Sequence, residues 1–212
     1  MPEIENESRK IFWLGGSPCS GKSSISEMLA SRFDLDVYHV DDAFEIQTQS
    51  LNPEQQPNLS RWLASSWNER WMQPVEILVE DVIACYREQL AVILNDIGKK
   101  PDRKSLLVEG TALLPRQIAR ILSNPSQAIW IVPTSSFQKE HYSKREWART
   151  IVEQCDDPEA AFQNWMERDI RFAEWIEAEA GALGLLSWRI DGIRTMAENA
   201  EEVARHFQLT TD

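Results

Sequence analysis

The sequence predicts an α/β protein in which a five-stranded parallel sheet carries helices on both faces. Short apolar runs rich in β-branched and aromatic residues alternate with segments that have the apolar spacing of amphipathic helices. This alternation is typical of parallel strands joined by crossover helices. A glycine-rich segment also follows the first apolar run directly, as in folds where a strand passes through a tight loop into a helix. The expected strands are residues 11–14, 37–40, 106–108, 128–132 and 185–190.

The expected helices follow from apolar residues repeated every three or four positions. In residues 24–33, Ile25, Met28, Leu29 and Phe33 share one stripe, which predicts a core-facing surface. A long helix over residues 74–98 begins at a proline and ends at a glycine. The polar, Pro- and Gln-rich residues 47–60 predict a loop. Further helices are expected at residues 115–122, 158–180 and 197–207.

Length and composition favour one soluble domain over residues 1–212. The chain has 212 residues, 42% hydrophobic and 26% charged, and no stretch approaches the roughly 20 apolar residues that span a bilayer. Its N-terminal residues are acidic, unlike a signal or transit peptide, so we expect a cytoplasmic protein without a membrane partner. The net charge of −12 argues against binding a nucleic acid polymer.

The segment Gly-Ser-Pro-Cys-Ser-Gly-Lys-Ser at residues 16–23 is the strongest functional signal. Backbone N–H groups in such a loop surround the phosphates of a nucleoside triphosphate, and the following helix N-terminus adds positive partial charge. Lys22 would neutralise the outer phosphates, and the Ser23 hydroxyl would bind Mg²⁺. A tight turn is the simpler alternative, but the order strand, loop, helix favours phosphate binding. The expected nucleotide-binding residues here are Gly16, Ser17, Pro18, Cys19, Ser20, Gly21, Lys22, Ser23 and Ser24.

The three cysteines are far apart, which indicates neither a disulfide framework nor a zinc site. Cys19 lies inside the phosphate loop, where a helix N-terminus can lower the pKa of a thiol and make it sensitive to oxidation. The simpler interpretation is that Cys19 is a small residue that fills space in the loop.

The order of these motifs along residues 11–207 resembles that of the P-loop small-molecule kinases, the superfamily of nucleoside, nucleoside-monophosphate, gluconate and shikimate kinases. The segments YHVDDAF at 38–44 and LVEG at 107–110 look most like the uridine kinase and nicotinamide riboside kinase branch. The resemblance implies the P-loop NTPase fold, a helical acceptor-binding insertion over residues 43–100 and a lid over residues 134–157. It also implies ATP and Mg²⁺ as cofactors and a small-molecule acceptor.

Acidic residues follow two of the expected strands. An alcohol acceptor must lose a proton during phosphoryl transfer, and a carboxylate beside the phosphate loop suits that role. The resemblance implies that Asp41 is the base, with Asp42 as the second choice, and that Asp41 and Glu109 are Mg²⁺ ligands beside Ser23. Helix capping is the alternative for the aspartates, and an exposed loop carboxylate is the alternative for Glu109.

The basic residues after the fourth strand resemble the lid of these kinases: Lys139, Lys144, Arg145 and Arg149. Arg145 and Arg149 are four residues apart, so a helix would place both on one face, with Arg145 on the transferring phosphate and Arg149 on the nucleotide. A solvated charged helix with Glu140 and Glu146 as partners is the alternative. Arg168 is a further candidate for the phosphates.

Two more segments are candidates for ligand contacts. Asp191 and Gly192 lie where such kinases pack the adenine, although a strand-end turn alone would explain them. Trp71 can stack on a planar acceptor while Arg61 or Arg70 holds an anionic group. The helical spacing of Trp67 and Trp71 favours core packing as the alternative.

The leading hypothesis is an ATP- and Mg²⁺-dependent kinase that phosphorylates a hydroxyl of a nucleoside, a sugar-like metabolite or an antibiotic. A nucleoside-monophosphate kinase is favoured instead if Arg61 and Arg70 converge on a phosphate. A non-catalytic nucleotide-binding switch is the third hypothesis. The sequence leaves open the acceptor, ATP against GTP, and the oligomeric state, including a homodimer.

Overall fold

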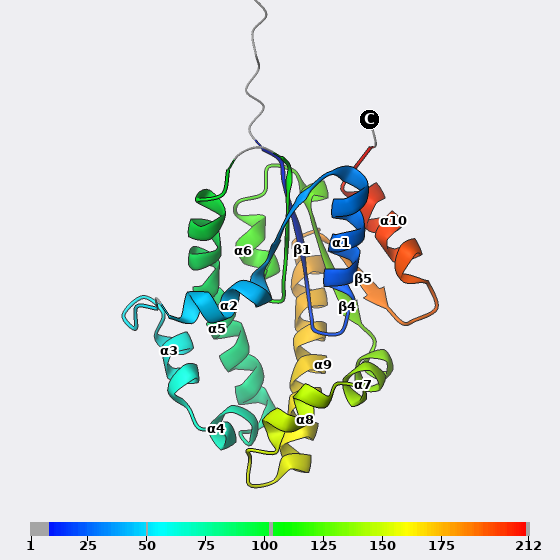
Figure 1. Cartoon of the computed structure of the whole chain (residues 1–212). Helices are drawn as coiled ribbons and strands as arrows, with labels where there is room; N and C mark the ends of the chain where they lie inside the picture. Colours follow the sequence, from blue (N-terminus) through cyan, green and yellow to red (C-terminus); the bar gives the residue numbers. More distant parts are fainter. Residues whose placement is uncertain (1–8, 50, 102–103, 211–212) are drawn as a thin grey trace, which may run out of the picture.

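The computed structural model describes residues 9–49, 51–101 and 104–210, and its centre is a five-stranded, all-parallel sheet (Figure 1). The strands are β1 (Ile11–Gly16), β2 (Asp36–His39), β3 (Leu106–Glu109), β4 (Ala128–Pro133) and β5 (Leu186–Ile190). Their order in the sheet is β2-β3-β1-β4-β5. This confirms the predicted fold class, and all five carboxyl ends lie at the same edge of the sheet.

Helices cover both faces of this sheet, as the sequence predicts (Figure 1). On one face, Phe12 and Leu14 of β1 pack in a cluster with α1 (Lys22–Phe33) and α10 (Met196–His206). On the other, Trp13 packs in a cluster with α5 (Val75–Gly98), α6 (Pro115–Ala119) and α9 (Pro158–Ala182). Successive strand residues point to opposite faces, so both faces of β1 are buried.

The chain between β2 and β3 forms a mainly helical insertion, but its first part differs from the sequence prediction. The helices are α2 (Val40–Thr48), α3 (Pro57–Ala64), α4 (Trp67–Trp71) and the long α5. The predicted loop at residues 47–60 is wrong at both ends, because α2 continues through Thr48 and α3 begins at Pro57. Among the described residues 51–56, none is helical.

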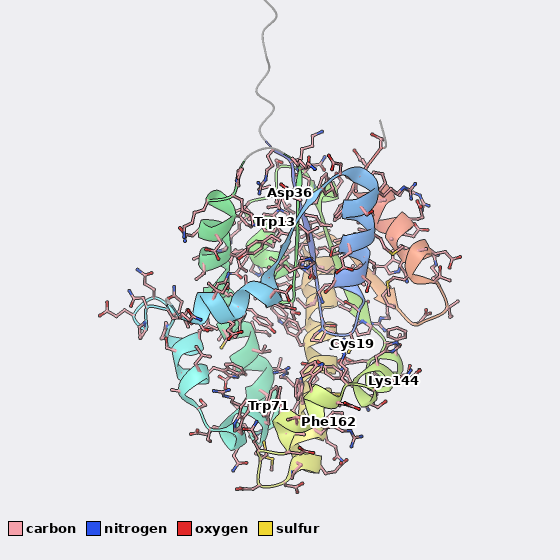
Figure 2. All side chains as sticks on the ribbon, in the orientation of Figure 1. Trp13, Cys19, Asp36, Trp71, Lys144 and Phe162 are labelled. Carbon is pink, nitrogen blue, oxygen red and sulfur yellow. The ribbon has the colours of Figure 1, made fainter. Side chains whose placement is uncertain are left out.

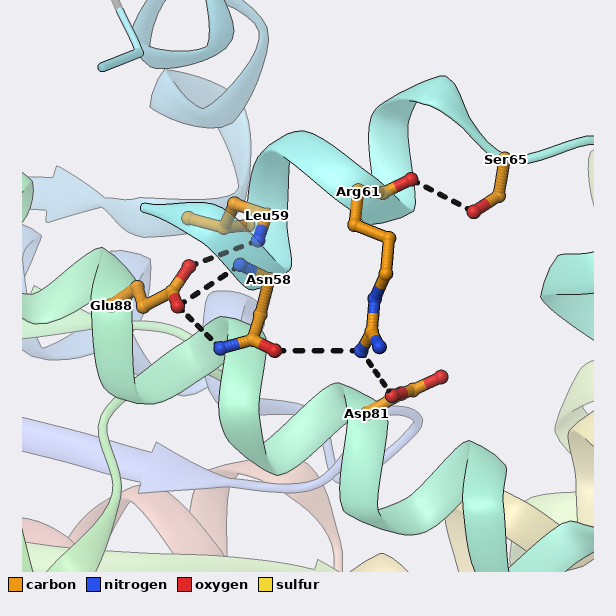
Figure 3. A network of polar contacts seen from close by, with 6 residues as sticks. All are labelled: Asn58, Leu59, Arg61, Ser65, Asp81 and Glu88. Atoms are coloured by element: carbon orange, nitrogen blue, oxygen red, sulfur yellow. Dashed lines mark hydrogen bonds and ion pairs between the residues drawn. The ribbon is translucent and has the colours of Figure 1, made fainter. Parts of the chain in front are cut away.

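The start of α3 is stabilised from a distant part of the chain. The carboxylate of Glu88 on α5 accepts hydrogen bonds from the backbone N–H groups of Asn58, at 3.0 Å, and Leu59, at 2.9 Å (Figure 3). These are N–H groups of the first turn of α3, which have no partner inside their own helix. A negative charge at this end also complements the helix dipole. Within the insertion, α3 is thereby fixed to α5.

A third apolar cluster joins the lid region to the insertion and to the phosphate loop. The lid consists of α7 (Ser135–Ser143) and α8 (Glu146–Val152). Its side chains Tyr142 and Val152 pack in one cluster with Trp71 of α4 and Trp165 of α9. Cys19 of the phosphate loop belongs to the same cluster. The loop that carries the phosphate-binding signal is therefore packed against both flanking regions.

Smaller differences from the sequence predictions concern the ends and faces of elements. Met28 is 39% exposed although it shares the predicted stripe with the buried Ile25 and Leu29. The predicted helix 115–122 ends at Ala119, and Val40 opens α2 instead of closing β2. No described helix has the length and apolar character needed to cross a membrane.

Candidate functional site

The loop between β1 and α1 requires backbone conformations that its sequence provides. Gly16 has φ 130°, and a Cβ at this position would lie 1.9 Å from the carbonyl oxygen of Ile131 on β4. Only glycine permits this close approach of two strands. Gly21 has φ 81° and directly precedes α1, which has no side-chain cap. The first N–H groups of α1 therefore point toward the loop without a side-chain partner, as an anion site requires.

Lys22 is held inside this loop. Its Nζ donates to the carbonyl oxygen of Ser17 at 2.8 Å, and the Ser20 hydroxyl donates to the same oxygen at 2.9 Å. The residue is only 6% exposed. Burial lowers the pKa of Lys22, while the negative charges of Asp41 and Glu109 oppose that shift. Both acids thus act electrostatically on the lysine, which is the arrangement expected around a phosphate site.

Glu109 is buried at the end of β3, so the alternative of an exposed loop carboxylate is wrong. The residue is 2% exposed, and its Oε1 lies 2.7 Å from Nδ1 of His39 on the neighbouring β2. Its Oε2 is buried and has no hydrogen-bond partner among the described residues. A buried carboxylate oxygen in this position calls for a cation or an ordered water. Together with the exposed Ser23 hydroxyl, it fits the donor set that Mg²⁺ prefers.

The two adjacent aspartates differ in their surroundings. Both lie in the first turn of α2, directly after β2. The carboxylate oxygens of Asp41 lie 3.4 Å from the backbone nitrogen and from the hydroxyl of Thr111, and Asp41 lines a cavity. Both aspartates are exposed, but Asp42 is not among the described residues of that cavity wall. Neither aspartate is the N-cap of α2, a position that His39 occupies.

The cavity beside Asp41 has a volume of about 320 Å³ and is enclosed by the insertion, α8 and α9. Aromatic side chains dominate its wall. Five of the nine tryptophans of the chain line it, together with Phe44 and Tyr86. These tryptophans are Trp62, Trp67, Trp71, Trp147 and Trp165. The size and the apolar lining are those of a small-molecule site.

Arg168 on α9 lines the same cavity but has its own partner. It donates from Nε and Nη2 to Oδ1 of Asp169, at 2.8 and 2.5 Å, and its guanidinium lies 4.8 Å from the Trp71 ring centre. Oδ2 of Asp169 accepts a hydrogen bond from the Tyr142 hydroxyl at 2.8 Å. Burial is the largest influence and lowers the pKa of Arg168, but Asp169, Tyr86 and Tyr142 together hold that pKa above the usual value. The positive charge of Arg168 in the cavity wall is therefore paired with Asp169, which is not among the described wall residues.

The two lid arginines are not on one helix face. Arg145 is the N-cap of α8, and its guanidinium lies over the rings of Tyr142, at 5.2 Å, and Trp147, at 5.7 Å. Its positive charge also acts to lower the pKa of Cys19 and of Lys22 in the phosphate loop. Arg149 is exposed, with its guanidinium 5.9 Å from the Phe162 ring centre on α9.

The other basic residues of the lid are at the surface. Lys139 and Lys144 are both exposed, and Lys144 pairs with Glu140 at 2.7 Å. This is the solvated charged helix that the sequence left open as an alternative. Of the four predicted basic lid residues, Arg145 acts electrostatically on Cys19 and Lys22 of the phosphate loop, and its role at a phosphate stays a prediction.

Of the predicted acceptor residues, Trp71 lines the cavity, whereas Arg61 and Arg70 are not among its described wall residues. Arg61 is exposed and pairs with Asp81 on α5 at 2.6 Å (Figure 3). Arg70 donates to the carbonyl oxygen of Leu63 at 2.7 Å and lies between the rings of Trp62 and Trp67. Together with Arg168, the two arginines line a smaller adjoining pocket of about 20 Å³, which also contains Asp81, the partner of Arg61.

Asp191 and Gly192 form an exposed turn after β5. Oδ1 of Asp191 accepts from the backbone N–H of Ile193 at 3.0 Å, which is the strand-end turn described by the simpler alternative. The following helix brings this turn close to the phosphate loop. A Cβ on Gly21 would lie 2.7 Å from the Cε of Met196, the first residue of α10. An adenine position beside this turn remains a prediction.

Cys19 does not have the environment of a reactive thiol. Figure 2 labels it at the phosphate loop, next to the lid and α9. It is buried, and burial raises the pKa of the Cys19 thiol to about 11 against the opposing charge of Arg145. The residue fills space in the third apolar cluster, as the simpler interpretation proposed.

Several cavity residues were not identified from the sequence. Tyr86 and Trp165 lie in the predicted helices 74–98 and 158–180, Phe44 lies in the motif at 38–44, and Trp147 has no predicted role. All four lie on different helices, α2, α5, α8 and α9, which only the tertiary structure brings together. The high tryptophan content of the chain was a signal for Trp147 and Trp165, but not for Phe44 or Tyr86.

Comparison with known proteins establishes the fold. The chain is similar to the crystal structure of TT1252 from Thermus thermophilus, with 11% identity, coverage of 97% of this chain and 100% of that chain, and a TM-score of 0.55. A shikimate kinase from Acinetobacter baumannii matches at 14% identity, 94% coverage of this chain and 93% of that chain, and a TM-score of 0.46. A deoxyadenosine kinase from M. mycoides matches at 13% identity, 94% and 99% coverage and a TM-score of 0.47. No protein-family model and no curated protein matches the sequence.

We predict that Asp169→Asn lowers the free energy of unfolding by about 3–5 kcal/mol, because it leaves the buried Arg168 charge without its partner. Denaturant titration measures the change. Glu167→Gln is the matched control, since this neighbouring carboxylate pairs with Arg171 at the surface and should cost less than about 1 kcal/mol. Equal losses in the two variants would contradict the role assigned to the buried pair.

We also predict that native Cys19 resists alkylation at pH 8. With a pKa of about 11, roughly one thiol in a thousand is ionised there, against about a quarter for an unperturbed cysteine. The alkylation rate should therefore increase about tenfold per pH unit below that pKa. Peptide mapping after iodoacetamide treatment measures it, with urea-unfolded protein as the control. Equal labelling of native and unfolded protein would show that the thiol is accessible and reactive.

Proposed function

We propose that this protein is an ATP- and Mg²⁺-dependent phosphotransferase that moves the γ-phosphoryl group to a hydroxyl of a small molecule. The observation that carries the proposal is the position of Asp41. Its carboxylate lines the aromatic cavity and also acts electrostatically on Lys22 of the phosphate loop. A carboxylate in this position can interact with an acceptor bound in the cavity and is also close to a phosphoryl donor bound at the phosphate loop.

The donor half of the site is the phosphate loop. The uncapped N-terminus of α1 offers backbone N–H groups to phosphate oxygens. Lys22 Nζ, now bonded to the Ser17 carbonyl, would be drawn to the phosphates by their larger negative charge. Ser23 and Glu109 would hold Mg²⁺, which supplies charge neutralisation at the phosphate oxygens. The nucleotide-binding roles of Ser24, Asp191 and Gly192 belong to the same proposal.

The acceptor half of the site uses Asp41 as general base. An alcohol needs to lose its proton as it attacks phosphorus, and a carboxylate on the cavity wall can accept that proton. Because Asp41 is among the described wall residues of the cavity and Asp42 is not, the geometry favours Asp41. Arg145, held over Tyr142 and Trp147, would stabilise the charge of the transferring phosphoryl group from the lid side.

The other hypotheses have less support. A nucleoside-monophosphate kinase needs cations for the acceptor phosphate, and Arg61 and Arg70 have partners elsewhere. A nucleotide-binding switch has no need of a carboxylate in a small-molecule cavity. Within the kinase hypothesis, the segments at 38–44 and 107–110 support the uridine kinase and nicotinamide riboside kinase branch.

We predict that Lys22→Ala lowers the affinity for Mg-ATP by at least tenfold, because it removes a buried positive charge from the phosphate site. Isothermal titration calorimetry measures it. Lys144→Ala is the control, since this exposed lid lysine pairs with Glu140 and should leave the affinity unchanged. An unchanged affinity in Lys22→Ala would refute the assignment of the phosphate loop.

The second prediction separates the adjacent aspartates. Asp41→Asn should lower kcat by roughly 10²–10⁴, the usual effect of losing a general base, and leave the KM for ATP nearly unchanged. Asp42→Asn is the matched control and should retain activity, because Asp42 is exposed outside the described cavity wall. Steady-state kinetics with any accepted alcohol measures both variants. Loss of activity only in Asp42→Asn would assign the role of general base to Asp42 instead of Asp41.

A further inference from the structure

We propose that His39 is a positioning residue for Mg²⁺ binding, because its imidazole holds one carboxylate oxygen of Glu109 and leaves the other oxygen for the metal. The inference rests on the proposed function, since it adds a residue to the donor half of that site. It starts from the distance of 2.7 Å between Nδ1 of His39 and Oε1 of Glu109. The sequence pattern alone assigns no role to the His39 side chain.

The sheet places these two side chains on the same face. His39 is the last residue of β2 and is paired in register with Glu109, the last residue of the parallel strand β3. Leu107, two residues before Glu109, packs in the cluster with α1, and side chains alternate between the faces of a strand. Glu109 and His39 therefore lie on the α1 face, at the edge of the sheet where the phosphate loop leads into α1.

The direction of the hydrogen bond follows from the chemistry of the two groups. An ionised carboxylate has no proton to donate, so Nδ1 of His39 donates to Oε1 of Glu109. This bond determines which ring nitrogen carries the shared proton. The Glu109 side chain is 3% exposed, so solvent water has almost no access to it. Water therefore cannot simply replace the imidazole as the donor to Oε1.

The second oxygen of Glu109 is the one left for a cation. Oε2 is buried and has no hydrogen-bond partner among the described residues. The negative charge of Glu109 acts on Lys22, the residue before Ser23, so this carboxylate lies near the start of α1. A carboxylate that offers one oxygen suits Mg²⁺, because two oxygens of the same group would distort its octahedral shell.

Without His39, the carboxylate of Glu109 has a competing partner. Lys22 Nζ donates to the carbonyl oxygen of Ser17, and an ammonium group has three protons to donate. Lys22 can therefore also bond to a carboxylate that rotates toward it. Such an ion pair would remove the Glu109 oxygen from the metal and hold Lys22 away from the phosphates. The bond from His39 to Oε1 opposes that rotation.

The chain supplies few metal ligands, so the orientation of each one matters. No group of three or more His, Cys, Asp or Glu side chains is placed to hold a metal ion by itself in the part of the chain that the structure describes. At nucleotide sites, Mg²⁺ keeps several waters and takes further oxygens from the phosphates. Loss of a partner that orients a metal ligand typically lowers metal affinity roughly 10- to 100-fold.

The test measures how much Mg²⁺ strengthens nucleotide binding, so it needs no turnover. Isothermal titration calorimetry of the full-length protein with the non-hydrolysable ATP analogue AMP-PNP gives one Kd in excess Mg²⁺ and one in EDTA. The ratio of the EDTA value to the Mg²⁺ value is the Mg²⁺ effect. His39→Phe keeps a ring but removes the donor, and we expect it to lower the Mg²⁺ effect about tenfold.

Two outcomes of this titration would overturn the proposal. A general loss of structure in His39→Phe would weaken both affinities together and leave the Mg²⁺ effect unchanged. An unaltered protein that binds AMP-PNP equally well in Mg²⁺ and in EDTA would have no metal for Glu109 to hold.

Two further variants separate the hydrogen bond from the loss of a histidine. His39→Asn retains an N–H donor near the position of Nδ1 and should recover most of the Mg²⁺ effect. His206→Phe is the matched control, because His206 bonds to the carbonyl oxygen of Ala128 at 2.8 Å, at the amino end of β4. It should leave the Mg²⁺ effect unchanged. Equal losses in His39→Phe and His206→Phe, or no recovery in His39→Asn, would overturn the positioning role.

A double-mutant cycle tests whether His39 acts through Glu109. Glu109→Gln replaces the carboxylate, so it should lower the Mg²⁺ effect at least as much as His39→Phe. Adding His39→Phe to Glu109→Gln should cause little further loss, because no carboxylate is left to orient. Additive losses would show that His39 acts independently of Glu109 and would overturn the proposal.

Failure of this inference differs from failure of the proposed function. The proposed function fails when Lys22→Ala does not alter ATP binding or when Asp41→Asn retains full activity. If Lys22→Ala weakens nucleotide binding while His39→Phe keeps the full Mg²⁺ effect, the phosphotransferase proposal stands and the role of His39 is wrong.

Discussion

The buried ion pair between Arg168 and Asp169 connects the parts of the molecule that would form the site. Both residues lie on α9, but Asp169 also accepts a hydrogen bond from Tyr142 on α7, and the Arg168 guanidinium packs on Trp71 of α4. The pair is almost fully removed from solvent, so each charge depends on the other. It thereby holds the lid and the insertion against α9, and it sets the charge of the cavity.

The parallel sheet supplies the second constraint. Because its strands all end at one edge, the loop after β1, the first turn of α2 and Glu109 of β3 lie together. One short helix of the lid, α8, contributes to both the phosphate loop and the cavity. Arg145 at the start of α8 acts on the phosphate loop, while Trp147 and Ile151 of α8 line the cavity. A ligand in the cavity therefore contacts the helix that positions Arg145.

Sequence reasoning succeeded where local pattern and tertiary environment agree. The strands were identified because buried parallel strands are continuous apolar runs, and α5 because its spacing persists for many turns. It failed at residues 57–60, where α3 is stabilised by Glu88, about thirty residues further along the chain. It also placed Arg145 and Arg149 on one helix face, although α8 begins only after Arg145.

The sequence by itself determined the sheet, the phosphate loop and the acidic strand ends, because spacing along the chain controls each of them. Only the tertiary structure distinguished Asp41 from Asp42 and Arg145 from Arg149. It also showed that Arg168 is neutralised and that distant aromatic residues line one cavity. The physical reason is that charge compensation and burial depend on contacts between helices far apart in sequence, which no local pattern encodes.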